Sequence, residues 1–274
     1  MIVASNAVLS TQTRPIGALL RAWRERRRLS QLELALRAGV STRHLSFVET
    51  SRAKPSRELL TQLSEHLEVP LRERNRLLLA AGFAPLYSDS ALDAPQMTAV
   101  REAIVHLLRA FEPYPALVID RHWQLVDANR SFAIFTDGLS SDLLAPPVNL
   151  MRLAFHPDGL AARIVNLGEW RGYALARLRR QISQTSDELL ARLEEELTAY
   201  PCAQPTPIVE IPGPSEVAVP LRVRVGDEEL AFLSIVAAFG TALDVNVAEL
   251  AIEAFVPADA ATAERLGAAR VSGR

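Results

Sequence analysis

The chain has 274 residues, of which 49% are hydrophobic and 23% are charged, a composition typical of a soluble globular protein. Its length suits one large domain or two ordinary ones. No apolar run is long enough to cross a bilayer, and residues 1–14 lack the basic start and apolar core of a signal peptide. Cys202 is the only cysteine, so an internal disulfide is excluded, and we expect a cytoplasmic protein that binds no membrane.

The charge is distributed unevenly along the chain. Residues 1–90 carry 14 basic and 8 acidic side chains, whereas residues 91–274 carry 16 basic and 24 acidic ones. A basic front joined to an acidic body indicates a polyanionic partner for the front only. The alternative is that the arginine-rich helix faces are merely solvated.

Five helices are predicted in the basic segment, and the start of the second has the clearest signal. Ser30 followed three residues later by Glu33 is a capping box, in which each residue satisfies a backbone N–H near the other. Gly39 allows the sharp turn that ends this helix, and Ser41 caps the next one. The apolar residues expected to form the small core are Ile16, Leu19, Leu20, Trp23, Leu32, Ala35, Leu36, Leu45, Val48, Leu59, Leu60, Leu63 and Leu67.

Two helices joined by a short glycine-containing turn leave the outward face of the second free to enter a DNA major groove. The segment from Ile16 to Leu71 resembles the Cro/C1-type (XRE-type) helix-turn-helix domain. The residues that carry the resemblance are Ser30-Gln31, Leu34-Ala35, Gly39-Val40-Ser41, Leu45-Ser46, Glu49 and Pro55. We therefore expect an all-α domain over residues 15–83. The side chains expected to contact DNA bases or phosphates are Gln31, Ser41, Thr42, Arg43, His44, Ser46, Arg52 and Lys54.

One position departs from that family. Such domains usually carry glycine where this chain has Ser51, and the position favours a left-handed backbone that serine adopts at a cost of roughly 1 kcal/mol. Glu49 is interpreted as a structural residue that braces the loop or an arginine of the first helix, and Trp23 as a core residue. The alternative for the whole module is a protein-interaction domain that has lost DNA binding.

After a proline-containing linker predicted over residues 84–98, the pattern changes from helical to mixed. Two β-rich runs form one predicted hairpin, and a second hairpin turns at Gly226-Asp227. Helical periodicity fills the sequence between the hairpins. This order predicts an α+β domain with an antiparallel sheet and a helical insert. The predicted segments are helices over 98–111, 149–182 and 187–200, a helix start over 129–135, and strands within 114–120, 123–129 and 216–239.

The acidic part of the chain also carries a family resemblance. The stretches "YPALVIDRHWQLVDAN", "NLMRLAFHPDGL" and "PLRVRVGDEELAFLSIVAAFGTALDVNVAELAIEAFVPAD" are similar to the MmyB-like ligand-binding domain of bacterial transcription regulators. In that family the domain also follows an XRE-type helix-turn-helix. The resemblance implies a PAS-like fold over residues 99–264 with an apolar interior cavity, and a fatty acid as a candidate ligand. Residues 1–14 and 265–274 are expected to be flexible tails.

A ligand cavity requires apolar walls and a few polar anchors. For a carboxylate ligand, Arg152 and His156 are the candidate anchors, because an arginine on an apolar helical stripe must find a partner or extend to water. Asn129 is expected to tie a strand end to the following helix. Plain core packing is the alternative for every apolar wall residue. The candidate wall residues are Phe132, Phe135, Leu150, Leu153, Phe155, Trp170, Phe232 and Phe239.

No catalytic motif is found, the five histidines have no metal-ligand spacing, and Cys202 has no neighbouring histidine, so we expect neither an enzyme nor a required cofactor. A PAS-like domain can also hold haem or flavin. His106, His122 and His156 are the conceivable haem ligands under that alternative.

The sequence thus predicts a ligand-responsive transcription factor. The N-terminal domain would bind double-stranded operator DNA as a homodimer, since one such helix reads few base pairs. The C-terminal domain would sense a small apolar, fatty-acid-like molecule and modulate operator binding. In the alternative hypothesis, the C-terminal domain is a protein-interaction module without a small ligand.

Overall fold

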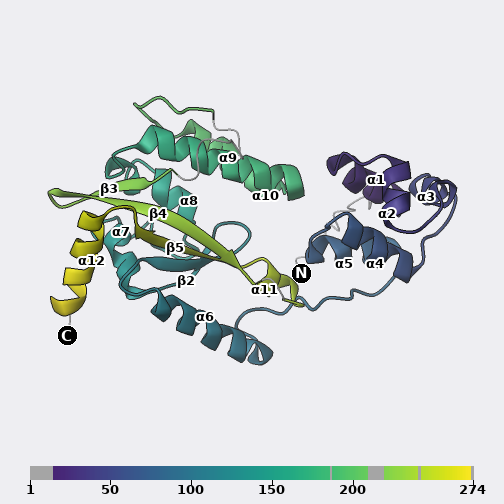
Figure 1. The fold of residues 1–274 in the computed structure, drawn as a ribbon, viewed down its shortest axis with the longest axis horizontal. Helices are drawn as coiled ribbons and strands as arrows, with labels where there is room; N and C mark the ends of the chain where they lie inside the picture. The colour runs from purple at the N-terminus through teal and green to yellow at the C-terminus, as the bar shows by residue number, and fades with distance from the viewer. Residues whose placement is uncertain (1–14, 186, 209–218, 240–241, 273–274) are drawn as a thin grey trace, which may run out of the picture. The chain divides into compact units, whose positions relative to one another are not determined.

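The computed structural model describes residues 15–185, 187–208, 219–239 and 242–272 (Figure 1). The chain divides into two compact units. The first holds the described residues up to Asp89 together with Leu243–Val245, and the second holds the rest. Among the described residues, no helix is both long enough and apolar enough to cross a membrane. The predicted tail over residues 1–14 lies outside the described residues.

The first unit contains the five predicted helices, and their ends follow the expected signals. Ser30 accepts the N–H of Glu33 at 3.1 Å, and the carboxylate of Glu33 accepts the N–H of Ser30 at 2.7 Å, which completes the capping box. Gly39 has a φ of 60°, and Ser41 caps the third helix by accepting the N–H of His44. The helices are α1 (Ile16–Arg26), α2 (Gln31–Arg37), α3 (Thr42–Glu49), α4 (Arg57–His66) and α5 (Leu71–Ala80).

The core of the first unit differs from the prediction on one helix. Leu32 and Leu36, predicted to be buried, are 57% and 72% exposed, whereas Leu34 is 1% exposed. The capping box sets where α2 starts, and from there Leu34 and Ala35 reach the inner side while Leu32 and Leu36, one turn apart, lie together on the outer side. The core residues are Leu20, Trp23, Leu34, Ala35, Ala38, Leu45, Val48, Leu60, Leu63, Leu67, Val69, Leu77 and Leu78.

Part of the predicted linker is held by α5. The side chain of Asn75 accepts the N–H groups of Leu86 and Tyr87 at 3.0 and 3.1 Å, and it donates to the carbonyl of Tyr87 at 2.8 Å. The stretch 86–87 of the predicted linker 84–98 therefore packs on the first unit. The predicted tail 265–274 also needs correction, because α12 (Ala260–Ser272) continues as a helix through most of it.

The second unit is built on one antiparallel sheet in the order β2-β1-β5-β4-β3. Both predicted hairpins are present, and Gly226 turns the second one with a φ of 60°. The strand β5 is not predicted by the sequence patterns, and it pairs with β1 on one side and β4 on the other. The strands are β1 (Ala116–Ile119), β2 (Leu125–Ala128), β3 (Leu221–Val225), β4 (Glu228–Ala238) and β5 (Ala251–Pro257).

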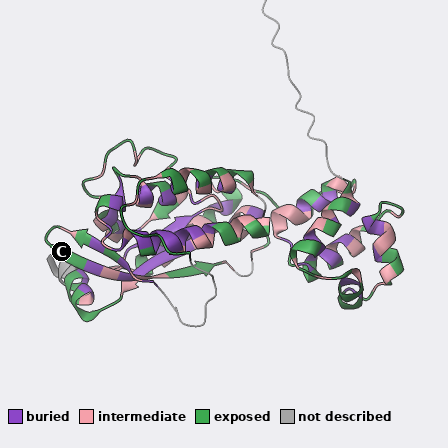
Figure 2. Ribbon diagram, turned by 90° about the horizontal axis from the view of Figure 1, so that it is seen from above, coloured by how far each residue is buried: buried purple, intermediate pink, exposed green. Residues whose placement is uncertain are grey.

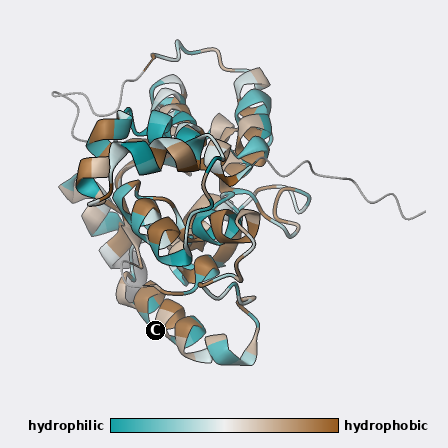
Figure 3. Ribbon diagram, turned by 90° about the vertical axis from the view of Figure 1, so that its right-hand side faces the viewer, coloured by the Kyte–Doolittle hydropathy of each residue, from teal (hydrophilic) through white to brown (hydrophobic). Residues whose placement is uncertain are grey.

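Helices cover the two faces of this sheet (Figure 1). On one face α8, α9 and α10 enclose the larger core, which includes Leu117, Phe232 and Phe255 from the strands. On the other face Ile104 and Leu108 of α6 pack against β1 and β5. Figure 2 shows buried residues concentrated between helices and sheet, and Figure 3 shows hydrophobic and hydrophilic residues alternating along the helices. The remaining elements are η1 (Pro95–Met97), α6 (Thr98–Ala110), η2 (Arg130–Phe132), α7 (Ala133–Thr136), α8 (Leu150–Phe155), η3 (Leu160–Ala162), α9 (Leu167–Thr185), α10 (Glu188–Ala199) and α11 (Val245–Ala248).

Asn129 has a different role from the predicted one. Its side chain accepts the N–H of Ala116 at 3.0 Å and donates to the carbonyls of Leu108 and Tyr114. It makes no side-chain cap on η2, the helix that follows. Asn129 therefore ties the end of β2 back to the start of β1 and to the last turn of α6, which fixes one edge of the sheet.

Candidate functional site

In the first unit, α3 presents a polar outward face. Leu45, Val48 and Glu49 point into the core. Thr42 and Ser46 lie one turn apart and are half-buried, whereas Arg43 and His44 are exposed. The guanidinium carbon of Arg43 lies 5.4 Å from the centroid of the Phe47 ring, so the arginine extends across an aromatic surface of its own helix. Ser41 caps the helix and is exposed at its first turn.

Gln31, at the start of α2, is oriented by a hydrogen bond to the buried side chain of Glu49. The Gln31 amide donates to the Glu49 carboxylate at 2.9 Å, and Arg24 of α1 makes two hydrogen bonds to the same carboxylate. Glu49 is thus structural, as predicted. A hydrogen bond from its amide nitrogen leaves the carbonyl oxygen of Gln31 without a protein donor among the described residues, and the side chain stays only half-buried.

The loop after α3 carries the two remaining predicted contacts. Ser51 has a φ of 59°, the left-handed conformation expected for this position. The N–H groups of Arg52 and Ala53 then both donate to the carbonyl of Phe47, which folds the loop back on α3. The side chains of Arg52 and Lys54 are exposed. All eight residues predicted to contact DNA therefore lie on α2, at the start and along the outside of α3, or in this loop.

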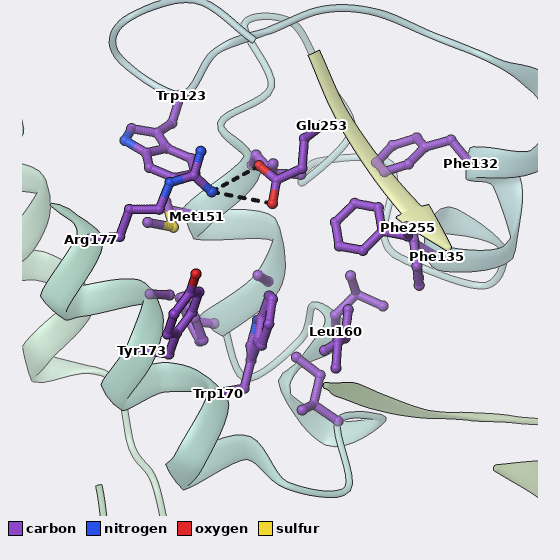
Figure 4. Close-up of a pocket in the computed structure, with 16 residues that line it drawn as sticks. Trp123, Phe132, Phe135, Met151, Leu160, Trp170, Tyr173, Arg177, Glu253 and Phe255 are labelled. Atoms are coloured by element: carbon purple, nitrogen blue, oxygen red, sulfur yellow. Dashed lines mark hydrogen bonds and ion pairs between the residues drawn. The ribbon is translucent and has the colours of Figure 1, made fainter. Parts of the chain in front are cut away.

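The second unit encloses a small apolar cavity of about 50 Å³ between α8, α9 and the sheet (Figure 4). Five of the predicted wall residues line it: Phe132, Phe135, Leu150, Phe155 and Trp170. The remaining lining residues were not predicted. They are Trp123, Met151, Ala154, Leu160, Ile164, Tyr173, Ala174, Arg177, Leu221, Glu253 and Phe255.

Three predicted wall residues do not line the cavity. Leu153 and Phe232 are fully buried in the same core behind it, and the Phe232 ring lies 5.3 Å from that of Phe135. Phe239 packs instead against the α6 cluster on the other face of the sheet. The helical and strand patterns identify apolar residues correctly, but they do not tell which of two faces a residue near a strand end will join.

The two predicted anchors lie away from the cavity. Arg152 makes two hydrogen bonds of 2.8 Å to Glu196 of α10, which raises the pKa of Arg152 and lowers that of Glu196. Burial and a hydrogen bond to Glu196 raise the pKa of Tyr200 to about 12. The His156 ring contacts the Tyr200 ring edge-on, with centroids 5.4 Å apart. This cluster joins α8 to α10, and none of its residues lines the cavity.

The charged residues among those that line the cavity are Arg177 of α9 and Glu253 of β5. One guanidinium nitrogen of Arg177 donates to both carboxylate oxygens of Glu253, at 3.2 and 3.3 Å (Figure 4). The Ser234 hydroxyl donates to the same carboxylate at 2.6 Å, and Glu253 is only 3% exposed. The guanidinium carbon of Arg177 lies 4.5 Å from the Trp123 ring centroid. An acidic residue within the apolar run "AIEAFV" is the sequence signal that marks this site.

Within the described ranges, no group of three or more histidine, cysteine, aspartate or glutamate side chains is arranged to hold a metal ion. The three histidines considered as haem ligands do not line the cavity. His122 bonds to Asp187 at 3.0 Å, His106 is exposed on α6, and His156 contacts Tyr200. The cavity is therefore an apolar space with one ion pair, Arg177–Glu253, at its side.

Comparison with known proteins agrees with both units. Residues 100–269, more than half of the chain, match the family model of the MmyB-like transcription regulator ligand binding domain. The chain belongs to the MmyB-like transcription regulators. Residues 20–74 match a helix-turn-helix model, so this MmyB-like regulator has the two domains and the fold class that its sequence predicts.

Curated relatives of this MmyB-like regulator occur in mycobacteria. Proteins described as uncharacterized HTH-type transcriptional regulators from Mycobacterium tuberculosis and Mycobacterium bovis are 36% identical to it over 107 residues. The matched stretch covers 39% of this chain and 38% of each relative. The similarity to these relatives is therefore confined to well under half of their length.

Proposed function

We propose that this protein is a DNA-binding regulator that inserts α3 into the major groove. The single observation that supports this most strongly is the polar outward face of α3, which carries Thr42, Arg43 and Ser46. The buried Arg24–Glu49 ion pair supports the same assignment, because Glu49 also fixes the side chain of Gln31 at the start of α2. Exposed Arg52 and Lys54 flank the face and suit phosphate oxygens. The basic charge of residues 1–90 supports the same partner.

The test compares a base-reading residue with a phosphate-binding one. A preferred duplex is first selected from a random pool with the full-length protein. Arg43→Ala should then reduce the preference for that duplex over random DNA, while the salt dependence changes little. Lys54→Ala should weaken binding to both duplexes alike and lower the salt slope by about 1. Unchanged binding by both variants would overturn the assignment of α3 as the reading helix.

We further propose that the regulator binds DNA as a homodimer. A single helix of this kind reads few base pairs, so useful specificity requires two half-sites about one helical turn apart. Sedimentation of the protein on the selected duplex should give two chains per site, and the selected sequence should be a palindrome. One chain on a non-palindromic site would contradict this proposal.

The C-terminal domain is proposed to bind a small molecule with an apolar chain, for which a fatty-acid-like compound is the candidate class. The cavity is apolar on nearly all sides but holds only about 50 Å³, whereas sites for drug-sized ligands hold about 300–1,000 Å³. A ligand must therefore bind a more open state of the domain. Such a ligand shifts the population toward that state, and this is how it would modulate operator binding.

Organic-solvent extraction of the purified full-length protein tests this part. A ligand-binding domain should release one apolar molecule per chain, or bind an added one with a change in fluorescence, because Trp123 and Trp170 both line the cavity. An empty extract together with no fluorescence response to apolar compounds would favour the alternative, in which the domain docks a protein partner.

A further inference from the structure

We propose that an open cleft on the second unit, separate from the apolar cavity, binds a small organic acid that joins one carboxylate to a compact apolar body. The cleft lies among the end of α6, η2, α7, the turn that joins β3 to β4, and α12 (Figure 1). Its volume is about 930 Å³, within the range of about 300–1,000 Å³ for small-molecule sites. It shares no lining residue with the cavity, so this inference goes beyond the proposed function.

Two exposed arginines come together in this cleft because of Asn129. The buried amide of Asn129 donates to the carbonyl of Leu108 at 3.1 Å, which holds the start of η2 against the last turn of α6. The next residue of each segment, Arg130 and Arg109, lines the cleft. Neither of these two side chains has a hydrogen-bond or ion-pair partner among the described residues, so both guanidinium groups are available to a ligand.

The cleft wall holds a third arginine whose charge is not met by a bonded carboxylate. The guanidinium of Arg163 donates to backbone carbonyls of α7, of the residue after α7 and of β3, at 2.7–3.3 Å. These bonds fix the wall, but neutral carbonyl oxygens do not cancel a full positive charge. Arg163 is half-buried, so its charge is less screened by water than that of an exposed arginine.

The charges of the lining leave one positive charge unbalanced. Arg265, the fourth arginine, pairs with Glu228 at 2.6 Å, and the carboxylates of Glu112 and Asp137 oppose two of the other three. Residues 91–274 as a whole carry 16 basic and 24 acidic side chains, so this cleft has the opposite sign to its domain. A cleft with charge of one sign concentrates ions of the other sign, and a single excess charge matches a monoanion.

Apolar side chains supply much of the remaining surface. Pro113, Ile134 of α7, Val225 of β3 and Leu266 of α12 line the cleft beside the arginines. A carboxylate can accept paired hydrogen bonds from a guanidinium while an attached apolar body covers these side chains. A cation would be repelled, an uncharged compound would lack the charge-assisted bonds, and a small inorganic anion would leave the apolar surface in water.

The experiment compares compounds that share one naphthalene ring system. Binding of naphthaleneacetate, naphthaleneacetamide and naphthylethylamine to the full-length protein is measured by calorimetry at about pH 7, where the acid is ionised and the amine is protonated. Naphthaleneacetate should bind at least about tenfold more tightly than the amide, the amine or plain acetate. Equal binding of the amide, or of acetate, would overturn the inference.

A double variant tests whether the carboxylate occupies this cleft. Arg109→Gln combined with Arg130→Gln should lower the affinity for naphthaleneacetate at least about tenfold, because both unpaired guanidinium groups are removed. The matched control is Arg180→Gln, since Arg180 is exposed on α9 and does not line the cleft. This control should change the affinity by less than about twofold. Wild-type affinity in the double variant would place the ligand elsewhere and contradict the proposal.

The outcome does not depend on the apolar ligand proposed for the cavity. Arg109 and Arg130 are exposed and unpaired, so their replacement should leave the fold and the cavity intact, which circular dichroism checks. An empty solvent extract would overturn the cavity proposal alone. A double variant that binds naphthaleneacetate as the wild type does would overturn the cleft proposal alone.

Discussion

Arg24 and Glu49 form a two-bond ion pair inside the helix-turn-helix domain, with nitrogen–oxygen distances of 2.7 and 2.8 Å. The Glu49 side chain is 1% exposed and that of Arg24 is 10% exposed. Because Glu49 also accepts from Gln31, the pair joins α1, α3 and the first residue of α2. The stability of the domain and the orientation of a predicted DNA contact thus depend on the same carboxylate.

Glu49→Ala should destabilise the protein by about 3–5 kcal/mol, because it leaves Arg24 buried without its carboxylate. The measurement is urea unfolding followed by circular dichroism. Glu228→Ala is the matched control, since Glu228 pairs with Arg265 on the surface and its loss should have little effect. Equal unfolding midpoints for the two variants would show that the buried Arg24–Glu49 pair contributes no more to the free energy of unfolding than a surface pair.

Ser51→Gly should stabilise the protein by up to about 1 kcal/mol. Ser51 has a φ of 59°, where a β-carbon is strained and glycine is not. Ser51→Ala keeps the β-carbon and should give no gain, which separates backbone strain from loss of the hydroxyl. Thermal unfolding of the three proteins makes the comparison, and a gain of the same size for alanine would contradict the strain argument.

Gly168→Ala should cost about 1–3 kcal/mol in stability. A β-carbon at Gly168 would lie 2.2 Å from the carbonyl oxygen of Pro205, because the extended segment after α10 crosses directly over α9. Gly267→Ala is the control in another helix. A β-carbon there meets no atom of the described residues within 4 Å, so the change should be neutral or stabilising by up to about 1 kcal/mol. Similar unfolding free energies for both variants would show that the segment at Pro205 can move away from α9 at little cost.

Asp187 should make the stability of the protein sensitive to acid. Burial alone would raise its pKa, but hydrogen bonds from His122 and from the N–H of Leu189, together with Arg121, lower it. A lowered pKa contributes stability that is present above the unfolded value of about 3.9 and is lost as the pH falls through the folded value.

The expected result is that Asp187→Asn loses stability at neutral pH and depends less on pH than the wild type below about pH 4. Urea unfolding at several pH values measures both slopes. Parallel slopes for the two proteins would show that Asp187 titrates alike in the folded and unfolded states.

The helix-turn-helix domain was predictable because its signals are local. Ser30 and Glu33 are three residues apart, and Gly39 itself suggests the backbone turn that it makes. The left-handed backbone at Ser51 is implied only by the family resemblance. The prediction that Leu32 and Leu36 are buried is wrong, because a seven-residue helix is too short for periodicity alone to identify its buried side.

The cavity was predictable only in part. Its aromatic walls follow from apolar patterning, but Arg177 and Glu253 are 76 residues apart in sequence, and their meeting depends on β5. Apolar patterning does not predict this strand, because the acidic Glu253 interrupts its apolar run. The position of Arg152 on an apolar stripe predicts an anchor inside the cavity, but Arg152 instead pairs with Glu196 of α10 at the surface.

The central place of β5 in the sheet also sets an order of events during synthesis. Its neighbour β1 ends at Ile119, so that strand must wait until Ala251–Pro257 has left the ribosome before the sheet can close. The five helices of the first unit, in contrast, complete their core within residues 16–83 and are available to fold early in translation. A nascent or truncated chain that stops before Ala251 therefore carries the complete helical domain, but its two hairpins, β1–β2 and β3–β4, lack the strand that joins them into one sheet.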